Sequence, residues 1–178
     1  KVSSFHNNLT LSITQGMNID QILETIHKNL EVPVIVQDLS FKTHHSVGLT
    51  EEQLHFLEQD FVNKMPQTKS GKILIQPIDP MQPMQISCPG HIRIISPIIV
   101  QQQVIGYISF IYFNDLYNFQ DEMNYVQRSA VSISLCYLNE KSSLEAMENI
   151  KAYFFEQLLQ KQYSSKKSMI NRSYLLQI

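Results

Sequence analysis

The sequence predicts an α+β fold built on an antiparallel sheet, and three observations point to it. Helical periodicity of apolar residues occurs near both ends of the chain, at 17–30 and again from residue 119 onward. Between them lie apolar, β-branched runs such as VPVIVQD (32–38) and SPIIVQQQVIGYISF (96–110). All five glycines and all seven prolines lie between Gly16 and Gly106, so strong helix breakers are confined to the central region. Helices that flank a group of strands are typical of α+β folds.

Length and composition bound the organisation of the chain. Its 178 residues suit about one domain with an appendage, and the 43% hydrophobic content can fill a core. No run of about 18 apolar residues could span a membrane, and the net charge of −2 argues against direct binding of a polyanion. The N-terminus has no signal-peptide pattern and no initiating methionine, and the two cysteines form no CxxC pair. We therefore expect a fragment of a cytoplasmic protein.

The first half of the chain predicts helices around a strand pair. FHNNLTLSITQ (5–15) favours a short helix, and a second helix follows Gly16, capped by Asn18 or Asp20. VPVIVQD predicts a buried strand, and FKTHHSVG (41–48) predicts its hairpin partner. Thr50 and Gln53 have the spacing of a capping box for a helix over 50–65, which the following proline ends.

The second half predicts the remaining strands and a long helix. KILIQPI (72–78) predicts a strand, and DPMQPMQISCPG (79–90) predicts a proline-rich loop without regular structure. The runs 92–99 and 104–113 are apolar on both sides of the pleat, so both faces of their sheet need cover. We expect the terminal helices to cover one face, and the 50–65 helix with the proline-rich loop to cover the other. A face that a loop covers is a good place for a pocket.

The register of the 96–110 hairpin decides which side chains share that pocket. A two-residue turn at Gln101-Gln102 would place Pro97 opposite Gly106, and Ser96 on one face with Tyr107 and Ser109. Gly106, on the other face, would then let a terminal helix approach closely. A shift of the pairing by one residue would exchange the two groups of side chains between the faces of the sheet, and it would bring Arg93 onto the pocket face. There its guanidinium could bind a carboxylate or ureido group. The candidate ligand-binding residues are Ser96, Tyr107, Ser109 and Arg93. The alternative is a filled core, with the hydroxyls bonded to the backbone and the arginine in solvent.

The sequence gives little support to a metal, a cofactor or an enzyme. His44 and His45 are adjacent on a predicted strand, so their rings point to opposite faces. Cys88, His91 and His45 could gather around zinc, but nothing in their spacing demands it. No Ser/His/Asp arrangement, phosphate loop or HExxH motif occurs. We expect a protein that is not an enzyme and has no cofactor and no metal.

The C-terminal helix predicts a homodimer. Its apolar stripe begins at Phe119 and continues past a polar break at residues 139–141. Left exposed, the apolar residues beyond that break would form an unusually large patch. The candidate interface residues are Val126, Ile133, Leu144, Met147, Phe154 and Leu158. The alternative is that a downstream domain covers them.

The hairpin and its flanking segments resemble a known family. Pro97 and Gly106, nine residues apart in SPIIVQQQVIGYISF, resemble the signature hairpin of GAF domains, although this chain has Gln101-Gln102-Gln103 where an Asp-Gly turn is usual. GMNIDQILETIHKNLEVPVIVQD (16–38) resembles the start of the GAF-type sensor in bacterial purine-catabolism and sugar-diacid regulators (PucR/CdaR). ENIKAYFFEQLLQKQYSSKKSMINRSYLLQI (148–178) resembles their connecting segment.

The resemblance implies a regulatory role. It implies a GAF-like sensor at 1–138 and a helical connector at 139–178, which leads toward a downstream domain and a DNA-binding helix-turn-helix beyond this sequence. The effector would be a small molecule such as a purine catabolite, a sugar diacid or an amino acid. Binding would be relayed through the long helix. The competing hypothesis is a constitutive dimerisation module with a filled core and no ligand.

Overall fold

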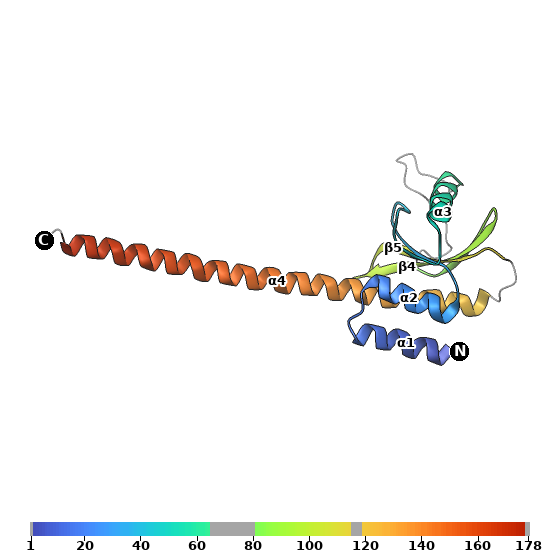
Figure 1. The fold of residues 1–178 in the computed structure, drawn as a ribbon, viewed down its shortest axis with the longest axis horizontal. Helices are drawn as coiled ribbons and strands as arrows, with labels where there is room; N and C mark the ends of the chain where they lie inside the picture. The colour runs from blue at the N-terminus through green and yellow to red at the C-terminus, as the bar shows by residue number, and fades with distance from the viewer. Residues whose placement is uncertain (1, 65–80, 115–118, 177–178) are drawn as a thin grey trace. The chain divides into compact units, whose positions relative to one another are not determined.

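The computed structural model describes residues 2–64, 81–114 and 119–176. The chain divides into two compact units, Lys1–Leu138 and Asn139–Ile178. The first unit contains all the strands that the structure describes and the beginning of the last helix (Figure 1). The roles predicted for the ranges 1–138 and 139–178 stay predictions.

The first unit is built on a five-stranded antiparallel sheet with strand order β2-β1-β5-β4-β3. Its strands are β1 (Val34–Asp38), β2 (Thr43–Val47), β3 (Met84–Cys88), β4 (His91–Val100) and β5 (Gln103–Tyr112). The central strands β1, β4 and β5 are mostly buried, as their continuous apolar runs predict. The predicted α+β fold is confirmed.

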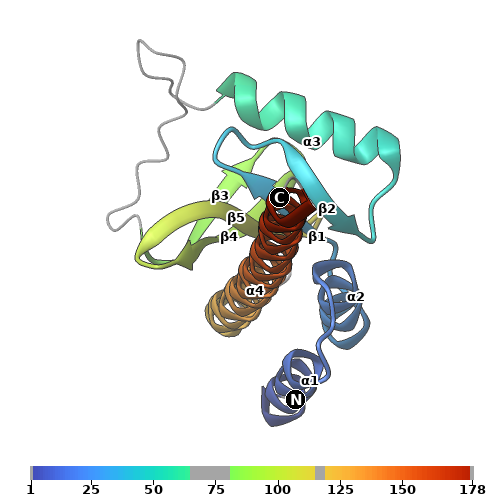
Figure 2. The same ribbon diagram turned by 90° about the vertical axis from the view of Figure 1, so that its left-hand side faces the viewer.

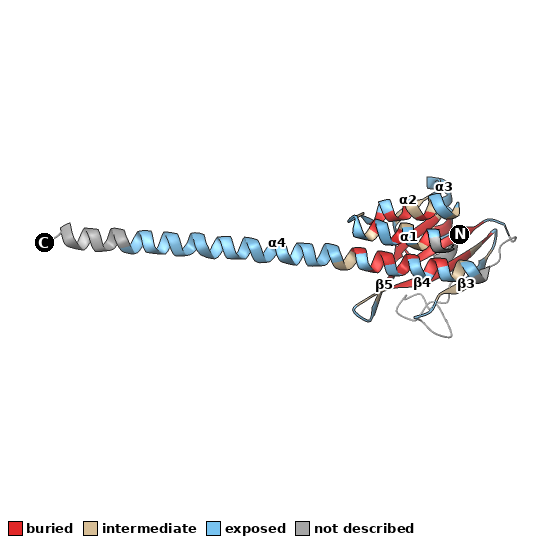
Figure 3. Cartoon of the chain, turned by 90° about the horizontal axis from the view of Figure 1, so that it is seen from below, coloured by how far each residue is buried: buried red, intermediate tan, exposed pale blue. Residues whose placement is uncertain are grey.

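Helix α2 (Ile19–Leu30) and the first part of α4 (Phe119–Leu176) cover one face of this sheet. Helix α1 (Val2–Thr14) packs on their outer side, away from the sheet (Figures 1 and 2). Helix α2 begins with a capping box between Asn18 and Gln21 and ends at Glu31 in the left-handed conformation. Its buried residues pack with Val34, Phe110 and Val126 in the main core, and Figure 3 shows this concentration of buried residues.

Helix α3 (Glu51–Lys64) lies on the opposite face (Figure 2). The predicted capping box is present, because the Thr50 hydroxyl accepts from Gln53 N and the Gln53 side chain accepts from Thr50 N. Leu57 of α3 forms a small apolar cluster with Ile35 and Ile111 of the sheet. The predicted strand at 72–78 and the first two residues of the predicted covering loop, 79 and 80, lie outside the described residues.

One prediction about the sheet is wrong. The segment 79–90, predicted as an irregular loop, contains strand β3, which pairs with β4 so that Met84 faces Ile95 and Cys88 faces His91. The prolines of this segment lie outside the strand, at 80, 83 and 89, where they remove no ladder hydrogen bond. Between them, Met84, Ile86 and Cys88 alternate with more exposed residues, which is the pattern of an edge strand.

The β4–β5 hairpin has a two-residue turn and a bulge. Gln101 and Gln102 both have positive φ, 51° and 65°, and Val100 pairs with Gln103. Ile99 pairs with Val104, whereas Ile98 pairs with Gly106, so Ile105 is an extra residue in β5. The turn therefore has the predicted length, but the bulge gives the alternative register.

The second unit is helical throughout its described part. Helix α4 continues to Leu176, and its side chains from Glu140 to Lys167 are exposed. No helix in the described ranges has a stretch long and apolar enough to cross a membrane.

Candidate functional site

The bulge in β5 brings three of the four predicted ligand-binding residues onto one face of the sheet. Pro97 faces Tyr107, Ile95 faces Ser109 and Arg93 faces Ile111. Arg93, Tyr107 and Ser109 lie on the face that α3 covers, which we call the α3-side face. It comprises Ile35, Gln37, His91, Arg93, Ile95, Tyr107, Ser109 and Ile111. Ser96 lies on the other face, so its grouping with Tyr107 and Ser109 is corrected.

Arg93 is the centre of a buried hydrogen-bond network. Its side chain has no exposed surface. Nη2 donates to the Leu57 carbonyl at 2.6 Å, Nε to His91 Nε2 at 3.1 Å, and Nη1 to Gln37 Oε1 at 3.4 Å. Because His91 Nε2 accepts this bond, that ring nitrogen carries no proton. The guanidinium thereby joins strand β4 to β1 and to α3, and the alternative of an arginine reaching solvent is wrong.

Gln37 extends the network to the β1–β2 turn. Its side chain is buried, and Nε2 donates to the Phe41 carbonyl at 3.0 Å and to Thr43 Oγ1 at 3.3 Å. Phe41 has φ of 63°, and its ring stacks on Tyr107 with centroids 4.9 Å apart. Sequence reasoning missed Gln37 and Phe41. The available signal was Gln37 itself, a polar residue that directly follows three β-branched residues in VPVIVQD. A buried amide needs hydrogen-bond partners, so this position indicated a polar contact within the sheet.

Ser109 and Tyr107 add two hydroxyl groups to the same face. Ser109 is fully buried, and its Oγ finds no hydrogen-bond partner among the described residues. Tyr107 is partly buried, and desolvation raises the pKa of its phenol above the ordinary value. The phenol therefore stays protonated and can donate a hydrogen bond.

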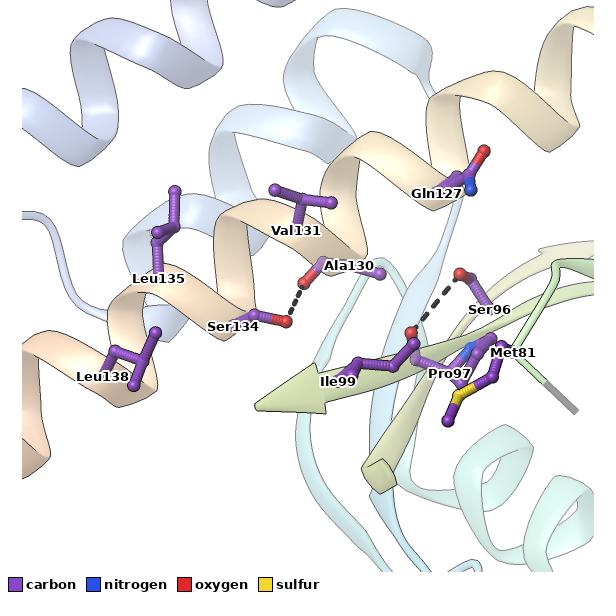
Figure 4. Close-up of a pocket in the computed structure, with 10 residues that line it drawn as sticks. All are labelled: Met81, Ser96, Pro97, Ile99, Gln127, Ala130, Val131, Ser134, Leu135 and Leu138. Carbon is purple, nitrogen blue, oxygen red and sulfur yellow. Dashed lines mark hydrogen bonds between the residues drawn. The ribbon is translucent and has the colours of Figure 1, made fainter. Parts of the chain in front are cut away.

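Ser96 lines a different pocket, between the sheet and α4 (Figure 4). The pocket has a volume of about 270 Å³, and its walls are mostly apolar, including Pro97, Ile99 and Leu138. Ser96 Oγ lies 3.5 Å from the Pro97 carbonyl, and Ser134 Oγ donates to the Ala130 carbonyl of its own helix. Both hydroxyls thus face backbone acceptors.

Gly106 also has a role that differs from the predicted one. A Cβ at this position would lie 2.4 Å from the carbonyl oxygen of Gln37, whereas no helix atom is among its nearest neighbours. The glycine is therefore needed for the close approach of β1 at the bulge, and not for the packing of a terminal helix.

Comparisons with known proteins bear on the fold. No protein-family model matches the sequence, and no curated protein matches it. The structure is similar to the GAF domain of Nlh2 from A. aeolicus in an inactive state, with a TM-score of 0.52 and 14% identity over 79% of this chain and 99% of that chain. The chain has a GAF-like fold.

Two further solved GAF domains are similar at lower scores. One is from the GAF domain/HD domain protein of Geobacter sulfurreducens, with a TM-score of 0.45 and 18% identity over 71% of this chain and 98% of that chain. The other is the cofactor-binding GAF domain of the nutrient sensor CodY from Clostridium difficile, with a TM-score of 0.43 and 14% identity over 66% of this chain and 83% of that chain.

The histidines and cysteines of the GAF-like unit do not converge on one point. His45 Nδ1 lies 2.7 Å from Asp20 of α2, and His44 Nε2 lies 2.8 Å from Asp38. Cys88 and His91 face each other at the β3–β4 end of the sheet. Within the described ranges, no three potential metal ligands from His, Cys, Asp or Glu come together.

The predicted dimer residues divide into two groups. Val126 and Ile133 have no exposed surface and belong to the main core of the GAF-like unit, so they are not available to a partner and the prediction is corrected there. Leu144, Met147, Phe154 and Leu158 lie in the second unit, with 54–61% of their surface exposed. Their role in a dimer stays a prediction.

Proposed function

We propose that the chain is a ligand-sensing domain whose effector binds on the α3-side face, at Arg93, Tyr107 and Ser109. The observation that carries this proposal is the buried polar network on a face whose other side chains are mostly aliphatic or aromatic. Polar groups are costly to bury unless they are hydrogen-bonded. The Ser109 hydroxyl lacks such a bond within the described part of the chain, and a ligand atom beside it would supply one.

The residues of this face favour a planar polar ligand. A guanidinium group matches a carboxylate or a ureido group geometrically. Tyr107 offers a phenol and, with Phe41, an aromatic wall. Purine breakdown products, sugar diacids and amino acids carry such groups, and they are the effector classes that we propose.

The network also suggests how binding would be transmitted. Arg93 contacts the α3 backbone directly and the β1–β2 turn through Gln37. A ligand that engages Arg93 more strongly in one arrangement of α3 would shift the population toward that arrangement. Couplings of this kind are typically worth about 1–3 kcal/mol.

We place this sensor in a bacterial transcription regulator of the PucR/CdaR type. The support is the likeness of residues 16–38 and 148–178 to that family's sensor and connecting segment. DNA binding would then belong to a helix-turn-helix elsewhere in the full-length regulator, and the protein would work in the cytoplasm as a regulator rather than an enzyme.

The exposed stripe on the second unit supports homodimerisation. Leu144, Met147, Phe154 and Leu158 are spaced by three, seven and four residues, so they fall on one side of α4. A second copy of the chain would cover this apolar surface, which is unusually large for a monomer. A constitutive dimerisation module without a ligand is the second candidate function, and this same stripe favours it.

Light scattering at micromolar concentration tests the dimer. Phe154→Gln with Leu158→Gln should shift the chain from dimer to monomer. Tyr153→Gln should leave it dimeric, because Tyr153 is as exposed as Phe154 but lies off the stripe. A monomeric wild-type chain would reject the dimer.

A thermal-shift screen with two matched serine variants tests the sensor. One compound among the proposed classes should raise Tm by several degrees. Ser109→Ala should reduce this shift, whereas Ser96→Ala should not, because both serines are buried but lie on opposite faces. A flat screen with a dimeric chain would favour the second candidate function, and an equal loss in both variants would remove Ser109 from the site.

A further inference from the structure

A second cavity lies within the helical layer, away from the α3-side face. It has a volume of about 450 Å³ and lies between α1 and α4. Its walls are the apolar side chains of Leu9, Ile13, Val131 and Leu135, together with five polar ones, His6, Thr10, Thr14, Arg128 and Ser132. We call it the α1–α4 groove. Its size lies within the usual range of small-molecule sites.

One side of each helix lines the groove. The α1 residues follow the spacing 6, 9, 10, 13 and 14, and the α4 residues follow 128, 131, 132 and 135, which are helical faces. Both helices run in the same direction (Figure 1). His6 and Arg128, the first residue of each series, therefore lie at one end, and Thr14 and Leu135 lie at the other.

The two ends differ in chemistry. His6 Nε2 is buried and has no hydrogen-bond partner within the described ranges. Burial, and next the charge of Arg128, lowers the pKa of His6, so the imidazole is neutral at pH 7. Arg128 is exposed, and no ion pair or hydrogen bond of its side chain occurs in the described structure. The end at His6 and Arg128 is therefore cationic, with an unused imidazole nitrogen.

The remaining polar groups of the groove are already bonded. Thr10 and Thr14 of α1 donate to the carbonyls of His6 and Leu11. Ser132 of α4 donates to the carbonyl of Arg128. Their methyl and methylene groups add to the apolar wall beyond the cationic end, where Val131 and Leu135 remain 56% and 39% exposed.

We propose that the α1–α4 groove binds a small carboxylate with an aliphatic body, which is a second ligand site of the chain. The carboxylate accepts hydrogen bonds from Arg128 and from Nε2–H of His6, and the aliphatic body covers Leu9, Ile13, Val131 and Leu135. The span from His6 to Thr14 is about 12 Å along the helix, so octanoate is a suitable probe. This site is independent of the proposed effector site, because the two share no residue.

Calorimetric titration of the full chain with octanoate tests the proposal. We expect a dissociation constant below about 1 mM, and at least about tenfold weaker binding of octanol, which lacks the charge. Arg128→Gln should weaken the binding of octanoate by about tenfold and leave the affinity for octanol unchanged. Lys141→Gln removes an exposed cation of α4 outside the groove, and it should change neither the affinity for octanoate nor that for octanol.

A spectroscopic readout separates this site from general hydrophobic binding. A carboxylate beside His6 favours the imidazolium, so saturating octanoate should raise the pKa of His6 in NMR titrations, with the resonance assigned by its loss in His6→Asn. Three results would each overturn the proposal: no octanoate binding at millimolar concentration, equal affinity for octanol, or a His6 pKa that does not move on binding. Ser109→Ala serves as a further control, because a loss of octanoate binding in that variant would place the ligand on the α3-side face instead.

Discussion

Nη2 of Arg93 donates a 2.6 Å hydrogen bond to the carbonyl oxygen of Leu57, which joins the centre of the sheet to helix α3. Both residues are buried. Helix α3 also contacts the sheet through Glu58, whose carboxylate accepts a 3.0 Å hydrogen bond from Thr43 N of β2, and through the apolar cluster of Ile35, Leu57 and Ile111. The Arg93 guanidinium is the buried polar link between α3 and the centre of the sheet, and the first prediction concerns that group.

Replacing Arg93 should destabilise the fold severely. Arg93→Gln leaves the Leu57 carbonyl and the Gln37 amide without their donors in a buried environment, which we expect to lower the free energy of unfolding by about 3 kcal/mol. Urea unfolding measures this. Arg128→Gln makes the same charge change at an exposed position and should stay within about 0.5 kcal/mol of wild type. Equal effects of the two changes would contradict the network.

The turn of the β4–β5 hairpin should be improvable. Gln101 and Gln102 both have positive φ, which costs a residue with a Cβ atom about 1 kcal/mol or more. Asn-Gly is the favoured pair for such a turn, so Gln101→Asn with Gln102→Gly should raise the free energy of unfolding by about 1 kcal/mol. Gln103→Gly lies in β5 and should lower it, because glycine weakens a strand. Both values come from urea unfolding.

Gly106 should tolerate no side chain. Gly106→Ala would bring a Cβ to 2.4 Å from the Gln37 carbonyl oxygen, so β1 or β5 must move. We expect a loss of about 3 kcal/mol in chemical unfolding. Gly90→Ala is the matched change at a position with φ of 81° and open space around it, and it should cost only about 1 kcal/mol. A mild effect at Gly106 would argue against the bulge.

Asp38 should stabilise the fold in a pH-dependent way. Burial opposes its ionisation, but hydrogen bonds from His44 and from the backbone of Lys42 and Ser40 outweigh this and hold the pKa below its ordinary value of 3.8. The unfolded chain then binds the proton more readily, so this stabilisation is complete above that value and is lost as pH falls below it.

Comparison with Asp38→Asn measures this contribution. The difference in unfolding free energy between wild type and the variant should be largest near pH 6 and should shrink as pH falls toward 3. Glu24→Gln removes an exposed carboxylate of α2 and should change the unfolding free energy little at either pH. A difference at Asp38 that is constant with pH would show that the carboxylate charge is not what stabilises the turn.

The elements of the fold were largely predictable, because local signals define them. Capping residues and apolar periodicity placed α2 and α3, and β-branched runs placed β1, β4 and β5. Strand β3 was missed because prolines surround it and its partner β4 lies beyond a turn. Its pairing depends on a neighbouring strand, which residue patterns within the segment do not reveal.

The candidate site was only partly predictable, and the reason is the register of one hairpin. Residues 92–99 and 104–113 are apolar on both sides, so a shift by one residue changes the hydrophobic pattern little. The bulge at Ile105 therefore left no clear signal, and it separates Ser96 from Tyr107 and Ser109. Gln37 joined the site through a long-range contact with Arg93, which the sequence alone does not specify, whereas His91 lies two residues from Arg93 on β4.

The bulge at Ile105 decides which way the side chains of β5 point. With the same two-residue turn and no bulge, Ser96 would face Tyr107, so Tyr107 and Ser109 would point toward α2 and α4, on the opposite side from Arg93. Deleting Ile105 would remove the bulge and leave Ile98 opposite Gly106, so the orientation of β5 would not change. The hairpin should therefore tolerate the loss of this one residue.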